Sequence, residues 1–322
     1  MFNEQQNLII IRTELDGVFF QEFEDQQAMP GRATAQTAEI FKPITITNGA
    51  YIYAVNKGVG LFDKIDELAS VPQEVPKVTN KATIYPAMFA KSILLSKQLF
   101  DDNMWGVWQR DVREMAEKAR ITMDFTAFGL FRGAFGTTLT ADGVSAVNVA
   151  HVLIGGGTTS NQVVVADITT NPATTALTTD SLNVAIVRLS KQVDQANVIR
   201  GSAAQCLVVP PELFMKATQL VKSALVPENG NNALNVWSME YQLRVYLSPF
   251  MSVQSDGTGS AAAWFILGRN HSVSRLIRQG VETALVPWQF SDNISYKYTA
   301  NFRENYFIQD YVGIVGAKGD AT

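Results

Sequence analysis

The sequence is poor in cysteine, histidine and charge. Its 322 residues include one cysteine, Cys206, and two histidines. A single cysteine excludes an internal disulfide and every zinc site that is built on cysteine pairs. Charged residues make up 17% of the chain, against about a quarter in an average globular domain. The net charge of -4 gives no basic field that could hold nucleic acid through its phosphates.

Long apolar runs are also missing. The first residues, MFNEQQNLIII, contain no basic residue and only a four-residue apolar run, and no window reaches the length of a membrane span. We therefore expect neither a signal peptide nor a membrane helix. What the chain does have is 47% hydrophobic residues, enough for a sizeable core in one large or two modest domains. Low charge with much apolar surface indicates a chain that buries surface against partners.

The residues that most often carry catalysis stand in unpromising contexts. No P-loop, H-E-x-x-H or G-x-S-x-G motif occurs, and the glycines at 155–157 lack the lysine and the spacing of a phosphate loop. We interpret His151, in NVAHVLIGGG, as a hydrogen-bonded structural histidine at a turn, with a catalytic base as the alternative. His271 is interpreted as a capping or surface residue. Cys206 lies in the apolar run QCLVV and is expected in a buried strand.

Asp101 and Asp102 precede a long helical pattern, so we expect them to cap a helix rather than to bind a metal with a third carboxylate. Nothing else in the sequence has the spacing of a ligand set. We therefore predict no catalytic, cofactor-binding or metal-binding residue, and no cofactor.

The long helical pattern covers residues 103–132. Apolar side chains at steps of three and four predict a single buried stripe, made of Trp105, Trp108, Val112, Met115, Ala119, Thr122, Phe125 and Phe128. The other face is charged, from Arg110 to Arg120, and is expected to be wet. We assign the stripe aromatics to the core rather than to base stacking, because no basic residues flank them. Gly133 marks the end of the helix.

Two segments precede this helix. Residues 13–24 form a short amphipathic pattern, followed by a small, polar lead; together they predict an arm that docks on something else. From residue 44 to 99, two apolar strand-like runs flank a charged section marked by prolines. This pattern predicts a long hairpin that returns to the start of the helix at 103.

No lysine or arginine occurs between Arg132 and Arg188. This stretch is interpreted either as packed against neighbouring chains or as an uncharged surface loop. Strand and helix patterns then alternate over residues 171–285, which predicts a compact α/β subdomain. Its parts are a helix from Thr179, a strand at 205–209, a helix from Pro211, a polar loop at 227–235 and strands within 241–250 and 261–268. Finally, apolar and polar residues alternate over 293–305, and we expect this strand to pair with 304–316 as an antiparallel couple beside the long helix.

The order of these segments resembles the major capsid proteins of tailed double-stranded DNA phages, which have the Hong Kong 97-like (HK97-like) fold. The phrases that carry the resemblance are RTELDGVFFQEFE, FAKSILLSKQLFDDNMWG, TADGVSAVNVAHVLIGGGTTSNQ, LVVPPELF and AWFIL, in this order. The fold so implied is α+β. Its implied parts are an N-terminal arm (1–43), an extended β-hairpin loop with its base strands (44–99), a peripheral domain (100–170) with the spine helix at 103–132, an α/β axial domain (171–285), and C-terminal strands of the peripheral domain (286–322).

The resemblance implies a structural protein, not an enzyme, that assembles with itself into pentamers and hexamers of an icosahedral shell around double-stranded DNA. It implies no sequence-specific DNA contact and no membrane, a place in the virion, and assembly in the cytoplasm of a host bacterium. A portal protein is an implied partner; scaffolding, maturation protease and decoration proteins serve some members. Because the arm helix begins by residue 13, a scaffold is expected to be separate or already removed. Some relatives crosslink through lysine and asparagine; Lys64, Lys77 and Lys81 lie in the hairpin, but no motif fixes a partner and we expect no crosslink.

Two other functions stay open. One keeps the fold but makes the chain an encapsulin-type shell around a cargo enzyme, which gene neighbours would distinguish. The other is a cytosolic α/β enzyme whose site involves His151 and Asp142, which loss of activity in a monomeric His151→Ala variant would support.

Overall fold

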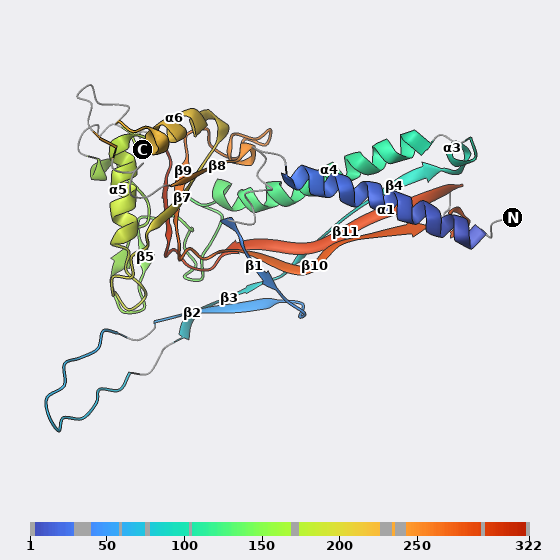
Figure 1. Ribbon diagram of the computed structural model, residues 1–322. Coiled ribbons are helices and arrows are strands. Elements are labelled where there is room, and N and C mark those ends of the chain that lie inside the picture. The colour runs from blue at the N-terminus through green and yellow to red at the C-terminus, as the bar shows by residue number, and fades with distance from the viewer. Residues whose placement is uncertain are drawn as a thin grey trace. The chain divides into compact units, whose positions relative to one another are not determined.

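The computed structural model describes residues 4–28, 40–57, 60–74, 78–102, 105–168, 174–225, 234–235, 243–290 and 294–319 (Figure 1). The chain divides into two compact units, and each is assembled from three segments. The first unit comprises Met1–Tyr51, Ile84–Ala127 and Arg275–Tyr306; the second comprises Ile52–Thr83, Phe128–Ser274 and Phe307–Thr322. None of the helices in the described ranges has the length and apolarity that a membrane span requires.

A four-stranded sheet forms the base of the first unit. Its strand order is β1-β10-β11-β4, so β1 and β4 are the edges. The strands are β1 (Lys42–Thr45), β10 (Val273–Val286), β11 (Ser295–Ile308) and β4 (Ala87–Ser96). β11 pairs antiparallel with β4 from Ser295↔Ser96 to Glu304↔Ala87. Every second residue of β11 from Tyr296 to Phe302 is buried, as the alternation predicts.

The predicted pairing of 293–305 with 304–316 is wrong. β11 runs unbroken to Ile308, and the strand that follows, β12 (Ile314–Ala317), pairs with a strand of the second unit's sheet. Residues 304–308 contain no glycine or proline, so nothing interrupts the strand there. The chain turns later, close to Gly313, whose φ of 83° lies in the left-handed region that glycine adopts without a steric penalty.

The long helix is confirmed as α4 (Trp105–Arg132), although residues 103–104 lie outside the described part. Trp108, Val112 and Met115 are buried as predicted, but Phe125 is 39% exposed and does not belong to the core. The prediction continued from Ala119 in steps of three residues. Each step of three residues turns the side chain by only about 300° around the helix axis, because the α-helix has 3.6 residues per turn. Phe125 therefore stands about 120° away from Ala119, and the buried line continues instead through other residues: Met123, Ala127, Phe128 and Phe131.

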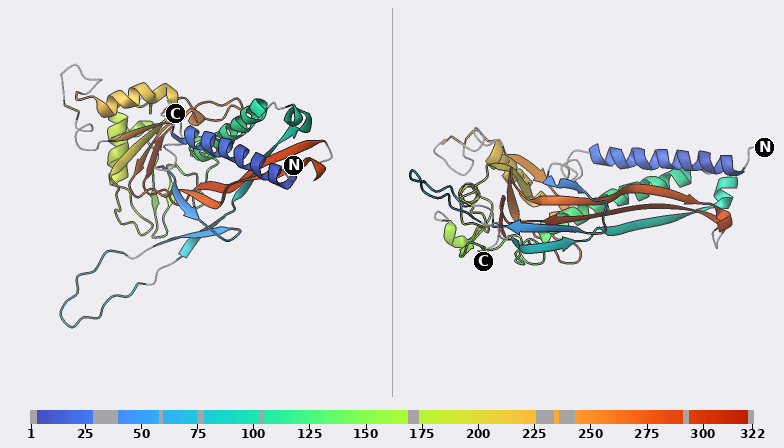
Figure 2. Two further views of the ribbon diagram at one scale, coloured as in Figure 1. Left: turned by 45° about the vertical axis from the view of Figure 1, so that its right-hand side comes forward. Right: turned by 90° about the horizontal axis from the view of Figure 1, so that it is seen from below.

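The N-terminal helix α1 spans Glu4–Ala28 and is twice as long as the predicted helix at 13–24. It lies beside α4 and the sheet of the first unit (Figure 2). Ile11, Leu15 and Phe19 enter the same apolar cluster as Trp108 of α4. The expectation that this helix docks on something else is therefore wrong for this structure, because it covers its own unit. The lead at 29–39 lies outside the described residues.

Polar contacts add to the docking of α1. The Asp16 carboxylate accepts hydrogen bonds from the Thr283 and Tyr298 hydroxyls, both at 2.7 Å. The Arg120 guanidinium lies 4.9 Å from the centre of the Phe23 ring. Arg120 is 7% exposed, so its assignment to the wet face of α4 is wrong; α1 covers it.

The predicted hairpin forms as a two-stranded sheet of β2 (Tyr51–Asn56) and β3 (Val78–Ile84). Figure 1 shows residues 60–74 as an open loop between these strands. The Gly60 amide donates to a Glu74 side-chain oxygen at 2.7 Å, which ties the two ends of the loop together. After β3 and β4 the chain passes through a short helix, α3 (Lys97–Asp101), before α4.

The second unit has a mixed sheet with the order β12-β9-β7-β8. β7 (Ala204–Val209) pairs parallel with β8 (Arg244–Leu247) and antiparallel with β9 (Trp264–Gly268). The predicted helices are α5 (Thr179–Ser190), capped by Thr178, and α6 (Pro211–Lys222), which begins with proline. Leu182, Leu207 and Ile266 belong to the core between helices and sheet. Most of the predicted loop 227–235 lies outside the described residues.

The stretch without lysine or arginine is mostly irregular, with two short strands, β5 (His151–Val152) and β6 (Thr158–Thr159). Ala146, Val147 and Val163 are buried, so part of it belongs to the core of the second unit, which neither interpretation of the sequence considered. The described residues also include three short 3-10 helices, η1 (Val165–Asp167), η2 (Pro249–Met251) and η3 (Trp288–Phe290).

Candidate functional site

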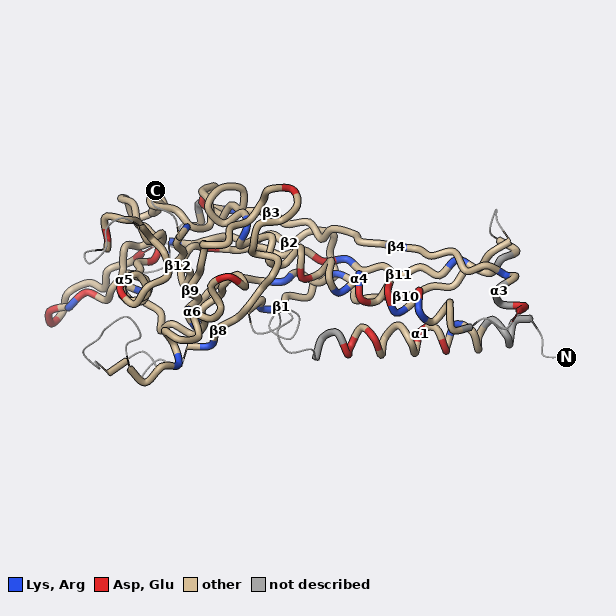
Figure 3. Tube along the Cα trace, turned by 90° about the horizontal axis from the view of Figure 1, so that it is seen from above, with Lys and Arg blue, Asp and Glu red and all other residues tan. Residues whose placement is uncertain are grey.

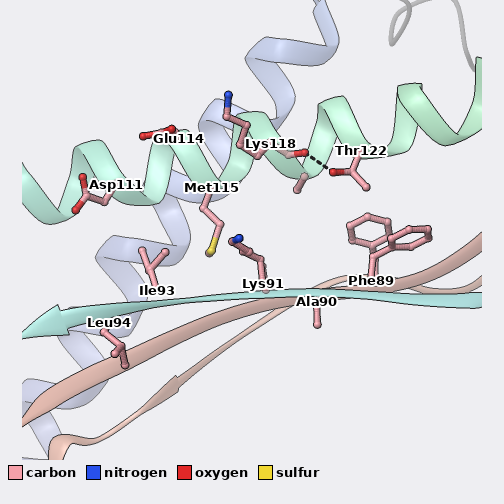
Figure 4. A pocket seen from close by; sticks show the side chains of 13 residues that line it. Phe89, Ala90, Lys91, Ile93, Leu94, Asp111, Glu114, Met115, Lys118 and Thr122 are labelled. Atoms are coloured by element: carbon pink, nitrogen blue, oxygen red, sulfur yellow. Dashed lines mark hydrogen bonds between the residues drawn. The ribbon is translucent and has the colours of Figure 1, made fainter. Parts of the chain in front are cut away.

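A groove of about 770 Å³ separates α4 from the edge strand β4 in the first unit (Figure 4). Phe89, Lys91 and Ile93 point from β4 toward the helix, as alternate residues of one strand must. The Phe89 ring stacks on Phe302 of β11 at 5.1 Å between centroids. Phe89, Ile93 and Phe302, with Met115 of α4, give the groove an apolar floor.

The rim of the groove is charged. Asp111, Glu114 and Lys118 come from α4, and Lys91 comes from β4. Figure 3 shows the alternation of acidic and basic residues along this helix. Among the strands that the structure describes, β4 pairs with β11 on one side only, so its other side presents backbone donors and acceptors. An apolar floor, a charged rim and an open strand edge together suit the binding of a protein segment.

The sequence analysis missed this groove. It assigned the residues of β4 to a hairpin and those of α4 to a stripe, and the two surfaces meet only in the folded unit. The signal available in the sequence was the apolar character of both faces of the strand, at Phe89 and Ile93 on one face and Met88 and Leu94 on the other. A strand that is apolar on both faces predicts cover on both sides.

The loop at 60–74 is the most exposed apolar segment that the structure describes. Phe62 and Leu68 are fully exposed, and Leu61 is 77% exposed. The loop also carries four acidic residues and one lysine. Apolar side chains gathered on one exposed loop mark an interaction surface, because water solvates them poorly. Of the three lysines that the sequence analysis considered for crosslinking, Lys64 and Lys81 are exposed and Lys77 lies outside the described residues.

His151 is completely buried in the second unit. Its Nδ1 lies 2.7 Å from Asp142 Oδ2, and its Nε2 lies 3.1 Å from Asn161 Oδ1. The orientation of the Asn161 amide is fixed separately, because its Nδ2 donates to the Ala146 carbonyl and its Oδ1 accepts from the Asn148 amide. Both ring nitrogens therefore face acceptors.

The rest of the network holds the histidine in place. The ring stacks on Tyr311 at 4.6 Å, and the Tyr311 hydroxyl donates to the Val193 carbonyl. Burial alone would raise the pKa of Asp142, but hydrogen bonds from His151, Thr140 and the Val144 amide outweigh it and lower this pKa. The His151 side chain is fully buried and both of its ring nitrogens are hydrogen-bonded. It therefore cannot contact a substrate unless this hydrogen-bond network is broken. The predicted hydrogen bonding of His151 is confirmed, although the residue lies in β5 rather than at a turn, and its structural role stays a prediction.

The other residues weighed in the sequence have structural places. His271 is 3% exposed, so its assignment to the surface is wrong; it follows the turn after β9, where the Gly313 backbone packs against it. Cys206 is buried in β7 as predicted. Asp101 ends α3 and pairs with Lys97 at 2.6 Å, rather than standing free to cap α4. The glycines at 155–157 form a turn. Among the described residues, no group of three or more His, Cys, Asp or Glu could hold a metal ion.

The Asp142–His151 pair predicts a pH dependence of stability. Because the pKa of Asp142 is lowered on folding, its contribution is complete above the ordinary carboxyl pKa near 3.8 and is lost as the pH falls through the lowered value. Denaturant unfolding of wild type and of Asp142→Asn is expected to differ at pH 6 and to converge toward pH 3. Asp63→Asn, in the exposed loop, is the control and should match wild type throughout. A difference that stays constant with pH would contradict the ion pair.

A family model described as "Phage capsid protein" matches residues 80–315, more than half of the chain. No curated protein matches the sequence significantly. Solved structures resemble this one at low sequence identity. The mature capsid of bacteriophage PhiM1 has a TM-score of 0.54 at 12% identity, with 88% of this chain and 86% of that chain covered. The capsid of a native GTA particle has a TM-score of 0.53 at 16% identity, with 90% of this chain and 91% of that chain covered. A virus-like particle from Pyrococcus furiosus has a TM-score of 0.53 at 8% identity, with covers of 95% and 98%.

Proposed function

Because the chain belongs to the phage capsid protein family, we propose that it is the major capsid subunit of a tailed double-stranded DNA phage and builds an icosahedral shell from pentamers and hexamers. Its fold is the α+β, HK97-like capsid fold. The observation that carries the proposal, beside the family match, is the exposed apolar loop at 60–74. A subunit with such a loop gains free energy by burying it on another subunit.

The parts of the chain take the roles that a shell requires. α1, within residues 1–43, serves as the N-terminal arm, and residues 44–99 serve as the extended loop with its base strands. α4 is the spine helix of the peripheral domain at 100–170, which β11 completes, whereas β12 pairs with β9 of the other sheet. The part of residues 171–285 that precedes β10 forms the axial domain at the centre of each capsomer, because β10 belongs to the sheet of the first unit. As a structural subunit, the chain needs no catalytic residue, in keeping with the engaged nitrogens of His151.

We place the loop of one subunit on the groove between α4 and β4 of its neighbour. The loop carries four acidic residues and one lysine, and the groove rim offers Lys91 and Lys118 beside the acidic Asp111 and Glu114. The exposed apolar side chains of the loop match the apolar groove floor. A contact between two different surfaces is heterologous, so repetition by rotation closes a ring, as pentamers and hexamers require.

This contact predicts the effect of charge reversal on the rim. The variant Lys91→Glu/Lys118→Glu is expected to assemble less than wild type at low salt, because the rim would repel the acidic loop. Raising the salt should restore part of the assembly by screening the repulsion. Lys297→Glu is the matched control, since it reverses an exposed lysine on β11 outside the groove. An equal loss of assembly in Lys297→Glu would mean that the net charge of the subunit, and not the groove, governs assembly. Light scattering of the purified subunits would follow the process.

The proposed function is tested by sedimentation velocity and electron microscopy of protein expressed with its neighbouring genes. Closed particles of megadalton size that contain nuclease-protected DNA are expected. Closed particles with a cargo enzyme and no DNA would favour the encapsulin-type shell. A species that stays monomeric or dimeric under all conditions would overturn the shell and return attention to Asp142 and His151.

The remaining partners follow from the role of a phage shell. A portal protein would occupy one vertex, and scaffolding, maturation protease and decoration proteins are further candidates. The shell would enclose DNA without sequence-specific contacts, in keeping with a net charge of -4. We propose assembly in the cytoplasm of the host bacterium and a final place in the virion. Copurification from infected cells tests each partner separately.

A further inference from the structure

A second, smaller pocket lies in the second unit at the C-terminal end of α4. Its volume is about 210 Å³, below the usual range of drug-sized sites. Three phenylalanines, Phe131, Phe135 and Phe265, form its apolar wall. The ring centroids of Phe131 and Phe135 lie 5.1 and 5.4 Å from that of Phe265. The wall is therefore a packed aromatic surface, and a small ligand would meet it without rearrangement.

Two cationic side chains, Lys318 and Arg132, line this aromatic pocket. Lys318 Nζ lies 6.0 Å from the centre of the Phe135 ring, and the structure gives the ammonium no carboxylate partner among the described residues. The Arg132 guanidinium donates from Nη1 to the Phe250 carbonyl at 2.8 Å. Burial lowers the pKa of Arg132, and the charge of Asp256 opposes this effect. Asp256 does not line the pocket, so the lining carries two positive charges and no negative one among the residues that the structure describes.

Ser260 supplies a third donor. Its Oγ accepts hydrogen bonds from the Ala262 and Ala263 amides, both at 3.1 Å. These bonds use the lone pairs of the hydroxyl and leave its hydrogen without an acceptor in the part of the chain that the structure describes. The backbone at Gly259 packs tightly against that of Ser252, because a Cβ on Gly259 would lie 2.3 Å from the Ser252 carbonyl oxygen. Ser260 is thus positioned by the backbone rather than by a ligand.

We propose that this pocket binds a carboxylate carried on an apolar stem. The carboxylate would accept from Lys318, Arg132 and Ser260, and the stem would lie on the aromatic wall. A divalent metal is a poor fit, because no carboxylate or imidazole of the described residues lines the pocket. A phosphate is also a poor fit, because three of the nine lining residues would present apolar rings to its oxygens. The same chemistry occurs in a free aryl carboxylate and in the carboxyl end of a peptide.

The test uses ligand-observed saturation-transfer NMR on the full chain, which works for subunits and for large particles alike. The probes are phenylacetate with its neutral amide, and N-acetylphenylalanine with its amide. Both carboxylates are expected to bind, and the amides to bind at least about tenfold more weakly, as the loss of a charge-assisted hydrogen bond would cause. Tighter binding of phenylacetate points to a free metabolite, and tighter binding of N-acetylphenylalanine to a peptide terminus.

Variants separate this pocket from unspecific binding. Lys318→Gln changes a partly exposed side chain and is expected to weaken carboxylate binding about tenfold. Lys191→Gln, at an exposed lysine that does not line the pocket, is the control and should bind as wild type does. Equal binding of carboxylates and amides, or equal binding by Lys318→Gln and wild type, would overturn the proposal. Stronger binding of inorganic phosphate than of phenylacetate would also overturn it.

Discussion

Subunits in which a short glycine-serine bridge replaces residues 60–74 are expected to fold normally and to form no closed shells. The replaced residues make no contact that the cores of the two units depend on, since Phe62 and Leu68 are fully exposed. β2 and β3 remain intact, because β2 ends at Asn56 and β3 begins at Val78. Circular dichroism and denaturant unfolding should match wild type, while sedimentation velocity should show only small species. The reason is the loss of the apolar surface that a neighbouring subunit would bury.

A less drastic change separates loop chemistry from loop length. Phe62→Ser/Leu68→Ser keeps the length and removes two exposed apolar side chains, and it should reduce assembly strongly. Asp63→Asn is the matched control, because it removes one charge and keeps both apolar groups; we expect nearly normal assembly. Closed shells from the subunits that lack 60–74 would refute the role of the loop, whatever the double variant shows.

Replacing Trp108 by alanine is expected to destabilise the unassembled subunit by about 3 to 5 kcal/mol. Trp108 is 1% exposed and lies in one cluster with Leu15 of α1 and Tyr298 of β11. Its ring meets that of Tyr296 edge-on, at 5.6 Å between centroids. Removing it leaves a cavity where the helix, the arm and the sheet of the first unit meet. Chemical denaturation of unassembled subunits would measure the loss.

Phe125→Ala provides the matched control on the same helix. The Phe125 side chain is 39% exposed, so its loss is expected to cost about 1 kcal/mol or less. The sequence placed both aromatics on one buried stripe, and the structure separates them. Equal destabilisation by the two variants would mean that Phe125 is covered in solution, for example by a neighbouring subunit that persists during the measurement.

Local sequence patterns were sufficient to predict a helix or strand wherever that element carried its own signal. The apolar spacing, the proline at position 211 and the glycine at 133 defined α4 and α6 to within a few residues. The alternation from Tyr296 to Phe302 defined β11. Errors arose where one local signal was extended too far, as at Phe125, or where a turn was placed without a turn residue, as between 303 and 305.

The candidate sites depended on contacts that no single segment encodes. The groove needs β4 beside α4, the network around His151 joins Asp142 and Asn161 across several turns, and the aromatic pocket joins Arg132 to Lys318 from the end of the chain. Sequence could name His151 and Asp142 as a pair worth testing. It could not show that both ring nitrogens are engaged and that the ring is fully buried.

The sequence by itself determined the elements that carry their own local signal, such as α4 and α6, together with the low cysteine and charge content and the resemblance to a capsid family. These depend on residues near one another in the chain or on composition. Tertiary structure alone decided that α1 covers its own unit, that β12 leaves β11 for the other sheet, and which side chains form the groove, the buried pair and the small pocket. The physical reason is that burial and pairing are settled by competition among all surfaces of the chain, and a local pattern specifies a buried face without specifying what buries it.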